Sequence, residues 1–136
     1  MLVDLNKIKN ILTSYKTIAI VGLSPKASRP SHEVASYLLA AGYRIIPVNP
    51  GQSEILGQTC YPNLTAIPEP VDIVDIFRKP ADIPPIAAEA IKIKAKVIWM
   101  QQGIINHEAA DLARQAGLMV VMDRCLKIDH ADLAAS

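Results

Sequence analysis

Aromatic residues are scarce in this sequence. Phe, Trp and Tyr together make up 4% of the 136 residues, with one Trp and one Phe. So few aromatic side chains argue against a row of stacking rings of the kind that binds single-stranded nucleic acid. Basic residues are not in excess either: the formal net charge is +1, whereas nucleic-acid-binding domains are usually strongly basic. We therefore expect no nucleic-acid partner, and a core built from aliphatic side chains.

The sequence also has few cysteines, no long apolar run and no recognisable export signal. The two cysteines, Cys60 and Cys125, are far apart and have no metal-ligand spacing, so we expect neither a metal site nor a disulfide framework. No apolar run approaches the roughly 20 residues that span a bilayer, and the first residues do not resemble the apolar part of a secretory signal. The sequence therefore predicts a soluble cytoplasmic protein that does not enter a membrane.

Short β-branched runs alternate with helical patterns along the chain. Strands are predicted at 17–21, 44–48, 72–77, 97–100 and 118–122, and helices at 3–14, 34–41, 83–91 and 106–117. Right-handed crossovers between such strands place helices on both faces of a parallel sheet. We therefore predict one α/β domain over residues 1–136. It is Rossmann-like, with a doubly wound parallel five-stranded sheet of order 3-2-1-4-5, and the N-terminal helix packs on it.

The loop after the first predicted strand is a candidate anion site. In doubly wound sheets, ligands bind beyond the carboxyl ends of the strands where the strand order reverses, which the predicted order places between strands one and four. The start of the helix that follows this loop favours a phosphate group. The other interpretation is a solvated surface loop. The candidate residues here are Gly22, Ser24, Lys26, Ser28 and Arg29.

The loop after the second predicted strand lacks an acidic residue. Domains of this class that bind NAD usually carry Asp or Glu there, which holds the ribose hydroxyls. This chain has Val48, Asn49 and Pro50 instead, so a plain NAD site is disfavoured and a ligand with extra phosphate on its ribose fits better. Arg78, after the third strand, adds positive charge to the same rim.

No constellation of catalytic residues is visible in the sequence. The three histidines, His32, His107 and His130, fall in separate segments without a triad or metal motif. Cys125 follows an arginine, but no base can be assigned to it. We therefore predict no catalytic residue and expect structural roles for the two cysteines.

Several short motifs resemble those of one protein family when they are taken in order. They are Ile20-Val21-Gly22-Leu23-Ser24, Ser28-Arg29-Pro30-Ser31, Pro47-Val48-Asn49-Pro50, the segment 71–78, Trp99-Met100-Gln101-Gln102-Gly103 and Met122-Asp123-Arg124-Cys125. Together they resemble the stand-alone coenzyme A-binding domain proteins, which are similar to the N-terminal nucleotide-binding domain of the succinyl-CoA ligase α subunit. The resemblance covers about residues 17–130.

The resemblance implies a Rossmann-type fold with coenzyme A as the bound cofactor. Carried over by position, the implied contacts are Gly22, Ser24 and Arg29 for the phosphates, Val48, Asn49 and Pro50 for the adenosine, Phe77 and Arg78 beside the ligand, and Gln101 and Gly103 toward the pantetheine. The phosphohistidine motif and the nucleotide-triphosphate domain of acyl-CoA ligases are missing from this sequence. We therefore expect a protein that binds CoA or acyl-CoA without chemistry of its own.

Two other functions are compatible with the same loops. One is an enzyme or regulator that binds NAD(P) or another nucleotide in the same cleft. The other is a scaffold whose cleft binds nothing. The apolar face of the first helix also leaves open a homo-oligomer or another protein partner, although packing on its own sheet explains that face equally well.

Overall fold

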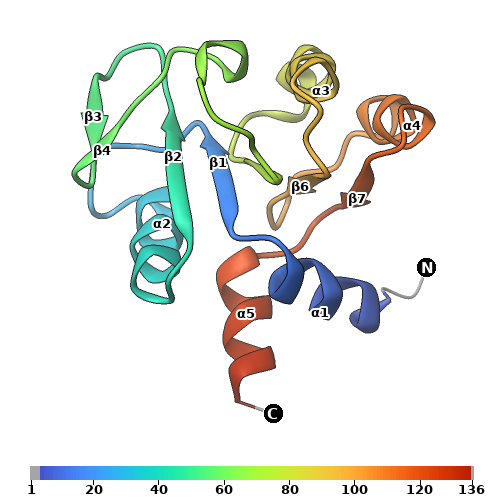
Figure 1. Ribbon diagram of the computed structural model, residues 1–136, viewed down its shortest axis with the longest axis horizontal. Coiled ribbons are helices and arrows are strands. Elements are labelled where there is room, and N and C mark those ends of the chain that lie inside the picture. Colours follow the sequence, from blue (N-terminus) through green and yellow to red (C-terminus); the bar gives the residue numbers. More distant parts are fainter. Residues whose placement is uncertain (1–3, 136) are drawn as a thin grey trace.

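The computed structural model describes residues 4–135 and contains a parallel sheet covered by helices on both faces (Figure 1). The helices are α1 (Leu5–Ser14), α2 (Pro30–Ala40), α3 (Ile83–Lys92), α4 (His107–Gln115) and α5 (Leu126–Ala134), with short 3-10 turns η1 (Leu64–Ala66) and η2 (Pro80–Asp82). The strands of the main sheet are β1 (Thr17–Val21), β2 (Arg44–Val48), β5 (Ile73–Ile76), β6 (Val97–Met100) and β7 (Met119–Val121). A two-stranded hairpin is formed by β3 (Glu54–Ile55) and β4 (Gln58–Thr59).

The five strands of the main sheet are all parallel, which confirms the predicted α/β, doubly wound class. The predicted strand order was wrong. The observed order is β2-β1-β5-β6-β7, or 2-1-3-4-5 when only these strands are counted, because β5 pairs with β1 instead of lying outside β2. Asp72 helps to hold this pairing, since its carboxylate accepts the backbone N–H groups of Lys16 and Thr17 at 3.3 and 3.2 Å.

The outer edge of β2 explains why β5 does not pair there. Pro47 has no N–H to donate, and proline in a sheet is found mainly on edge strands. The segment after β2 occupies that edge, since Val48 forms a bridge with Tyr61 and the Tyr61 N–H donates to the Pro47 carbonyl. The chain then returns past β1 to begin β5. The reversal of strand order consequently falls between β1 and β5, not between the first and fourth strands as predicted.

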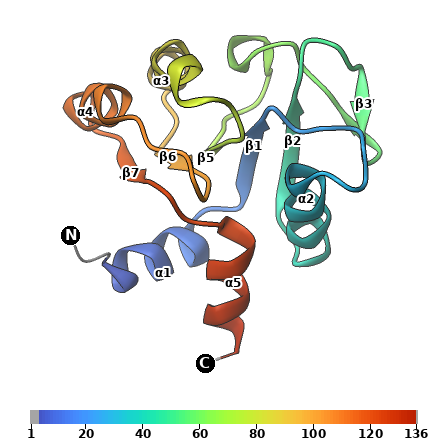
Figure 2. The same ribbon diagram turned by 180° about the vertical axis from the view of Figure 1, so that it is seen from behind.

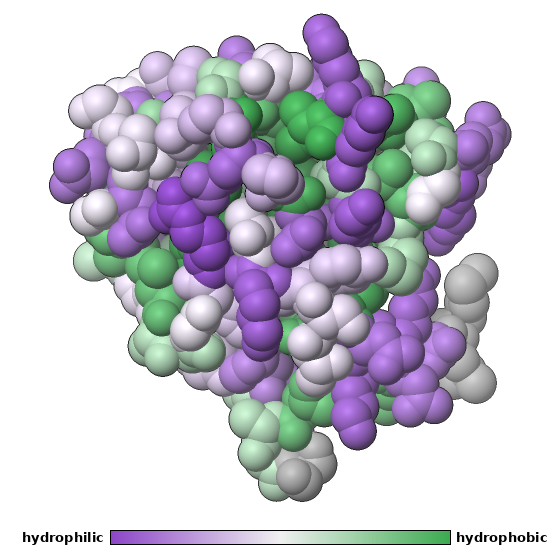
Figure 3. Space-filling view, viewed as in Figure 1, coloured by the Kyte–Doolittle hydropathy of each residue, from purple (hydrophilic) through white to green (hydrophobic). Residues whose placement is uncertain are grey.

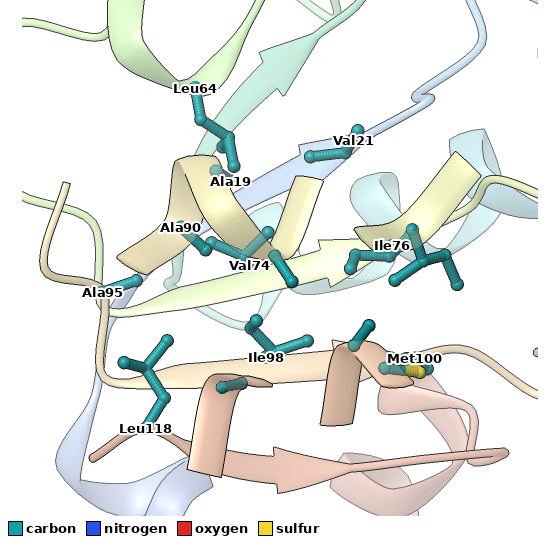
Figure 4. Packing of buried hydrophobic residues seen from close by; sticks show 14 of the residues in the cluster. Ala19, Val21, Leu64, Val74, Ile76, Ala90, Ala95, Ile98, Met100 and Leu118 are labelled. Carbon is teal, nitrogen blue, oxygen red and sulfur yellow. The ribbon is translucent and has the colours of Figure 1, made fainter. Parts of the chain in front are cut away.

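Two apolar layers hold the helices to the sheet. On one face, α3 and α4 cover residues such as Val74 and Ile98, and Figure 4 shows these side chains beneath Ala90 of α3. On the other face, α1, α2 and α5 cover Ile20 and Trp99. Figures 1 and 2 show the two helix groups on opposite sides of the sheet, with α3 and α4 above it and α1 and α5 below. The buried side chains are mainly aliphatic, as the composition predicted.

Most predicted elements are present with small changes in their bounds. The predicted first helix appears as α1, which Asp4 caps by accepting the Lys7 N–H; the predicted start at residue 3 lies outside the described residues. The β3–β4 hairpin was not predicted, and a further helix, α5, extends over Leu126–Ala134. No helix within residues 4–135 is both long enough and apolar enough to cross a membrane.

Candidate functional site

A cavity of about 290 Å³ opens at the carboxyl edge of the sheet, beside the reversal between β1 and β5. Its lining comes from the ends of β1 and β2, from residues 62–64, from Arg78 and from one side of the segment 81–89. In the space-filling view, hydrophobic residues reach the surface in the upper part, where Figure 1 draws α3, and hydrophilic side chains surround them (Figure 3). The reversal of strand order thus creates a hollow with both apolar and polar walls, as expected for ligand sites in this class of sheet.

Gly22 brings the loops after β1 and β5 into direct contact. Its φ is +87°, in the region that favours glycine, and a Cβ at this residue would lie 2.5 Å from the carbonyl oxygen of Phe77. The Cδ atom of Arg78 would be 3.0 Å from the same Cβ. Only glycine satisfies both restrictions, so the loops close up and Arg78 lies against the backbone of residue 22.

Arg78 is the only cation that lines the cavity among the described residues. Its guanidinium donates to the carboxylate of Asp82 at 3.2 Å, and both side chains are 43% exposed. An ion pair this exposed contributes at most about 1 kcal/mol, because water screens it and competes for both partners. An incoming anion can therefore replace Asp82 beside Arg78 at little cost.

The start of α3 offers few backbone donors to such an anion. Pro84 and Pro85 occupy its first turn, and neither has an N–H group. The Ile83 N–H is already donated to the carbonyl of Pro80. Anion binding on this side of the cavity therefore depends on the side chain of Arg78.

The loop from 22 to 31 forms the rim next to the cavity and does not line it beyond Gly22. Ser24 is tied into the loop, because its N–H donates to the Ser31 hydroxyl at 3.0 Å and its own hydroxyl accepts the Lys26 N–H at 3.1 Å. The side chains of Lys26, Ser28 and Arg29 are exposed and have no polar partner within residues 4–135. Two cations are thus presented to solvent at the start of α2.

The loop after β2 divides between the cavity wall and a structural tie. Val48 and Pro50 line the cavity, whereas Asn49 does not. The Asn49 amide donates to the carbonyl of Leu23 at 3.0 Å and its side-chain oxygen accepts the Gly51 N–H at 2.9 Å. Asn49 therefore joins the loops after β1 and β2, which explains its presence without a ligand.

The remaining predicted contacts lie away from the cavity. Phe77 packs with the apolar layer on the opposite face, and Gln101 is buried with its side-chain oxygen accepting the Leu126 N–H at 3.1 Å. The Gly103 N–H donates to the carboxylate of Asp123 at 2.6 Å. These contacts organise the loops after β5, β6 and β7. A ligand contact at these three residues stays a prediction.

Sequence reasoning missed three polar residues of the cavity, which are Asn63, Asp82 and Glu89. The Glu89 carboxylate accepts the Leu64 N–H at 3.1 Å, and the Asn63 side-chain oxygen accepts the Ala66 N–H at 3.0 Å. Glu89 lies three residues after Ile86 on α3, so the two residues share a helix face, but this spacing does not distinguish a cavity wall from a solvated surface. No local pattern points to Asn63, which reaches the site only through the chain reversal after β2.

Asp75 is a buried acid in the middle of β5, on the face away from the cavity. It is 0% exposed, it lies between Ile20 and Trp99 in register, and neither of its oxygens has a hydrogen-bond partner in the described structure. Burial without compensating donors raises the pKa of the Asp75 carboxyl well above its usual range. We therefore expect it to be protonated when the protein is folded.

The histidines and cysteines do not assemble a catalytic or metal centre. The Nδ1 atom of His130 on α5 forms a hydrogen bond of 2.7 Å with the hydroxyl of Tyr37 on α2. None of the three histidines lines the cavity. Cys60 and Cys125 are both free. Within residues 4–135, no three side chains of the metal-binding types come together.

Comparison with known proteins decides the family. The sequence profile described as "CoA binding domain" matches residues 16–131. The chain belongs to this CoA-binding domain family. The match covers most of the protein and confirms the family resemblance drawn from the sequence motifs. Membership of this family supports binding of coenzyme A.

Relatives of this CoA-binding domain include both short and long proteins. It is 44% identical over 125 residues to the uncharacterized protein YneT of Bacillus subtilis, covering 92% of this chain and 93% of that protein. It is 29% identical over 130 residues to the ADP-forming acetate–CoA ligase I of Archaeoglobus fulgidus, covering 88% of this chain but 19% of the ligase. The chain therefore corresponds to about a fifth of that ligase.

Solved structures confirm the fold of this CoA-binding domain. A hypothetical protein from Pyrococcus horikoshii superposes with a TM-score of 0.94 at 43% identity, over 97% of this chain and 93% of that protein. A dinucleotide-forming acetyl-coenzyme A synthetase of Ca. Korarchaeum cryptofilum superposes with a TM-score of 0.69 at 26% identity, over 76% of this chain and 25% of that protein. The same fold therefore occurs in a short protein and as part of a much longer one.

Proposed function

We propose that this domain binds coenzyme A or an acyl-CoA across the carboxyl edge of its sheet. In this proposal, the adenosine end enters the cavity between the ends of β1, β2 and β5. The phosphates lie toward Arg78 and the exposed cations of the first loop, Lys26 and Arg29. The observation that carries the proposal is the position of the cavity at the reversal of strand order, in a chain that belongs to the CoA-binding family.

The size of the cavity supports partial burial of the ligand. Pockets for small molecules usually measure about 300–1,000 Å³, and this one, at about 290 Å³, is at the lower end of that range. A ligand as long as CoA must therefore leave part of its length on the surface. We propose that its pantetheine arm extends along the edge toward Gln101 and Gly103, beyond the end of β6.

The charges around the cavity support a phosphorylated ribose. The residue after β2 is Asn49, so no carboxylate stands where NAD-binding domains usually hold the ribose hydroxyls. Arg78 borders the cavity, and Arg29 and Lys26 are free of side-chain partners at the adjacent rim. Guanidinium groups bind phosphate through paired, charge-assisted hydrogen bonds, which makes the two arginines the better candidates.

We further propose that the domain binds without catalysing a reaction by itself. None of the three histidines or two cysteines lines the cavity, and the acids that do, Asp82 and Glu89, each accept one hydrogen bond from a protein group. The activity printed in the names of the longer ligases is not transferred, because this chain corresponds to about a fifth of their length. Formation of acyl-CoA by the purified chain would contradict this part of the proposal.

Calorimetric titration of the ligand-stripped protein tests the proposal. We expect binding of CoA and acetyl-CoA that is tighter than binding of NAD or NADP. If the protein binds NAD or NADP more tightly than CoA, the ligand is a nicotinamide dinucleotide instead of CoA. If it binds none of the four compounds, the result favours a scaffold. Equal affinity for CoA and acetyl-CoA would mean that the ligand is held by its nucleotide end.

Arg29→Ala tests the phosphate contact separately. A hydrogen bond to a charged group contributes about 1.5–3 kcal/mol to the free energy of binding, so its loss should lower the affinity for CoA about tenfold to a hundredfold. Arg114→Ala is the matched control, because Arg114 lies on α4 and is paired only with the exposed Asp111. If Arg29→Ala binds CoA as tightly as Arg114→Ala does, Arg29 makes no phosphate contact.

A further inference from the structure

Two of the polar side chains that line the cavity, those of Asn63 and Glu89, each carry one polar atom without a partner in the described structure, and hydrogen bonds within the protein fix the other end of each. The first belongs to Asn63. Its side-chain oxygen accepts both the Ala66 N–H at 3.0 Å and the Thr65 hydroxyl at 2.8 Å. A backbone N–H can only donate, so the oxygen must face Ala66 and the NH₂ group must face the other way. Asn63 therefore presents a free donor.

The second unpaired atom belongs to Glu89 on α3. One carboxylate oxygen accepts the Leu64 N–H at 3.1 Å, which leaves the other oxygen without a partner among residues 4–135. Leu64 is 1% exposed and directly follows Asn63 in the chain. The Glu89 carboxylate is therefore held by the residue next to Asn63. Both line the cavity. A fixed donor and a fixed acceptor thus lie on the same side of it.

The other walls of the cavity are largely apolar. Pro50, Pro62 and Pro85 line it together with Val48 and Ile86. Proline rings and β-branched side chains have restricted conformations, so these walls lose little conformational freedom when a ligand binds. An aromatic ring that packs against them can turn its polar edge toward Asn63 and Glu89.

The order of donor and acceptor along the base edge distinguishes the purine bases. Adenine carries a 6-amino donor next to a ring-nitrogen acceptor, whereas guanine and hypoxanthine carry a 6-oxo acceptor next to a ring N–H donor. The carboxylate of Glu89 matches the adenine amino group and repels a 6-oxo group. The amide NH₂ of Asn63 matches the ring nitrogen beside it.

We propose that Glu89 and Asn63 read the base of the ligand and make the site specific for adenine. This inference rests on the proposed function, since it assigns the base to the cavity in which CoA is proposed to bind. A site built to hydrogen-bond one group discriminates strongly against an analogue that leaves its polar atoms unpaired. Replacement of the 6-amino group by an oxygen should therefore weaken binding about tenfold to a hundredfold.

The test compares CoA with its deaminated analogue, in which hypoxanthine replaces adenine. We expect the unmodified protein to bind CoA at least tenfold more tightly than the analogue. Glu89→Gln can still accept the Leu64 N–H through its amide oxygen, but it turns an NH₂ group toward the base. The preference for CoA should then collapse or reverse, with the ratio of the two affinities as the readout.

Two further variants make the result specific. Asn63→Asp keeps the oxygen that caps η1 and replaces the donor by an acceptor, so it should also reduce the preference for CoA. Glu108→Gln is the control, since it makes the same chemical change at an exposed residue in the first turn of α4. Using the affinity ratio removes any general effect of charge on the ligand's phosphates, and thermal melting checks that each variant is folded.

The outcomes separate this inference from the proposed function. Equal affinity of the unmodified protein for CoA and the analogue overturns base reading while leaving CoA binding intact. A preference for CoA that persists in both Glu89→Gln and Asn63→Asp overturns the assignment to these residues. If the protein binds neither ligand, the proposed function itself fails and this inference with it.

Discussion

The buried acid Asp75 gives the sharpest prediction for stability. Its carboxyl is 0% exposed and has no hydrogen-bond partner, and burial raises its pKa well above the usual range. In the unfolded chain an aspartate has a pKa of about 3.9. Between that value and the raised pKa, the folded protein keeps a proton that the unfolded chain releases. The free energy of unfolding therefore falls as pH rises through this interval.

The size of the effect follows from one proton. The linkage slope for a single site is at most about 1.4 kcal/mol per pH unit, so the contribution between pH 5 and pH 7 is at most about 2.7 kcal/mol. Asp75→Asn has nearly the same shape and no titratable proton. Its stability relative to the unmodified protein should therefore increase by up to about 2.7 kcal/mol between pH 5 and pH 7.

Urea denaturation at pH 5, 6 and 7 measures this difference. Asp111→Asn is the matched control, because Asp111 is 70% exposed on α4, and its pH dependence should follow that of the unmodified protein. A stability difference between Asp75→Asn and the unmodified protein that stays constant over this pH range would refute the reasoning. It would mean that Asp75 ionises alike in the folded and unfolded states.

Two further predictions concern the contact between the loops after β1 and β5. Gly22→Ala should destabilise the protein by at least about 1 kcal/mol more than Gly42→Ala, as measured by denaturation curves. Both glycines have a positive φ, but only at residue 22 would a Cβ collide with a backbone atom. Similar losses for the two variants would mean that the loops separate easily. Asp82→Asn should raise the affinity for CoA up to about fivefold, because it releases Arg78 from an exposed ion pair worth at most about 1 kcal/mol. Unchanged or weaker binding by calorimetry would show that Arg78 does not meet the ligand.

Local patterns were sufficient to predict the main elements. The runs Thr17–Val21 and Val97–Met100 are almost entirely buried in the sheet, and near-continuous apolar runs are typical of strands covered on both faces. Pro84 and Pro85 lie in the first turn of α3, and Asn106 caps α4 by accepting the Ala109 N–H. These are short-range effects of backbone geometry and hydrogen bonding, so they can be recognised without the tertiary fold.

The cavity was predicted only in part. Gly22, Val48, Pro50 and Arg78 follow strands directly, and parallel strands bring their carboxyl ends to one edge, so their meeting was predictable. Glu89 lies within a helix, where neither its residue type nor its spacing separates a pocket wall from a solvated surface. It lines the site because α3 packs beside η1, which is a contact between distant segments.

The amino-acid sequence by itself determined the strands and helices, the parallel sheet and the set of loops at its carboxyl edge. Each of these depends on periodicity, on capping residues or on the direction in which parallel strands run. Only the tertiary structure decided that β5 pairs with β1, which moved the reversal of strand order from the predicted place. It also placed Asp75 between Ile20 and Trp99 with no partner for its carboxyl. Strands of similar apolar composition can pair in several orders, and the choice among them depends on edges such as that of β2 and on long-range packing.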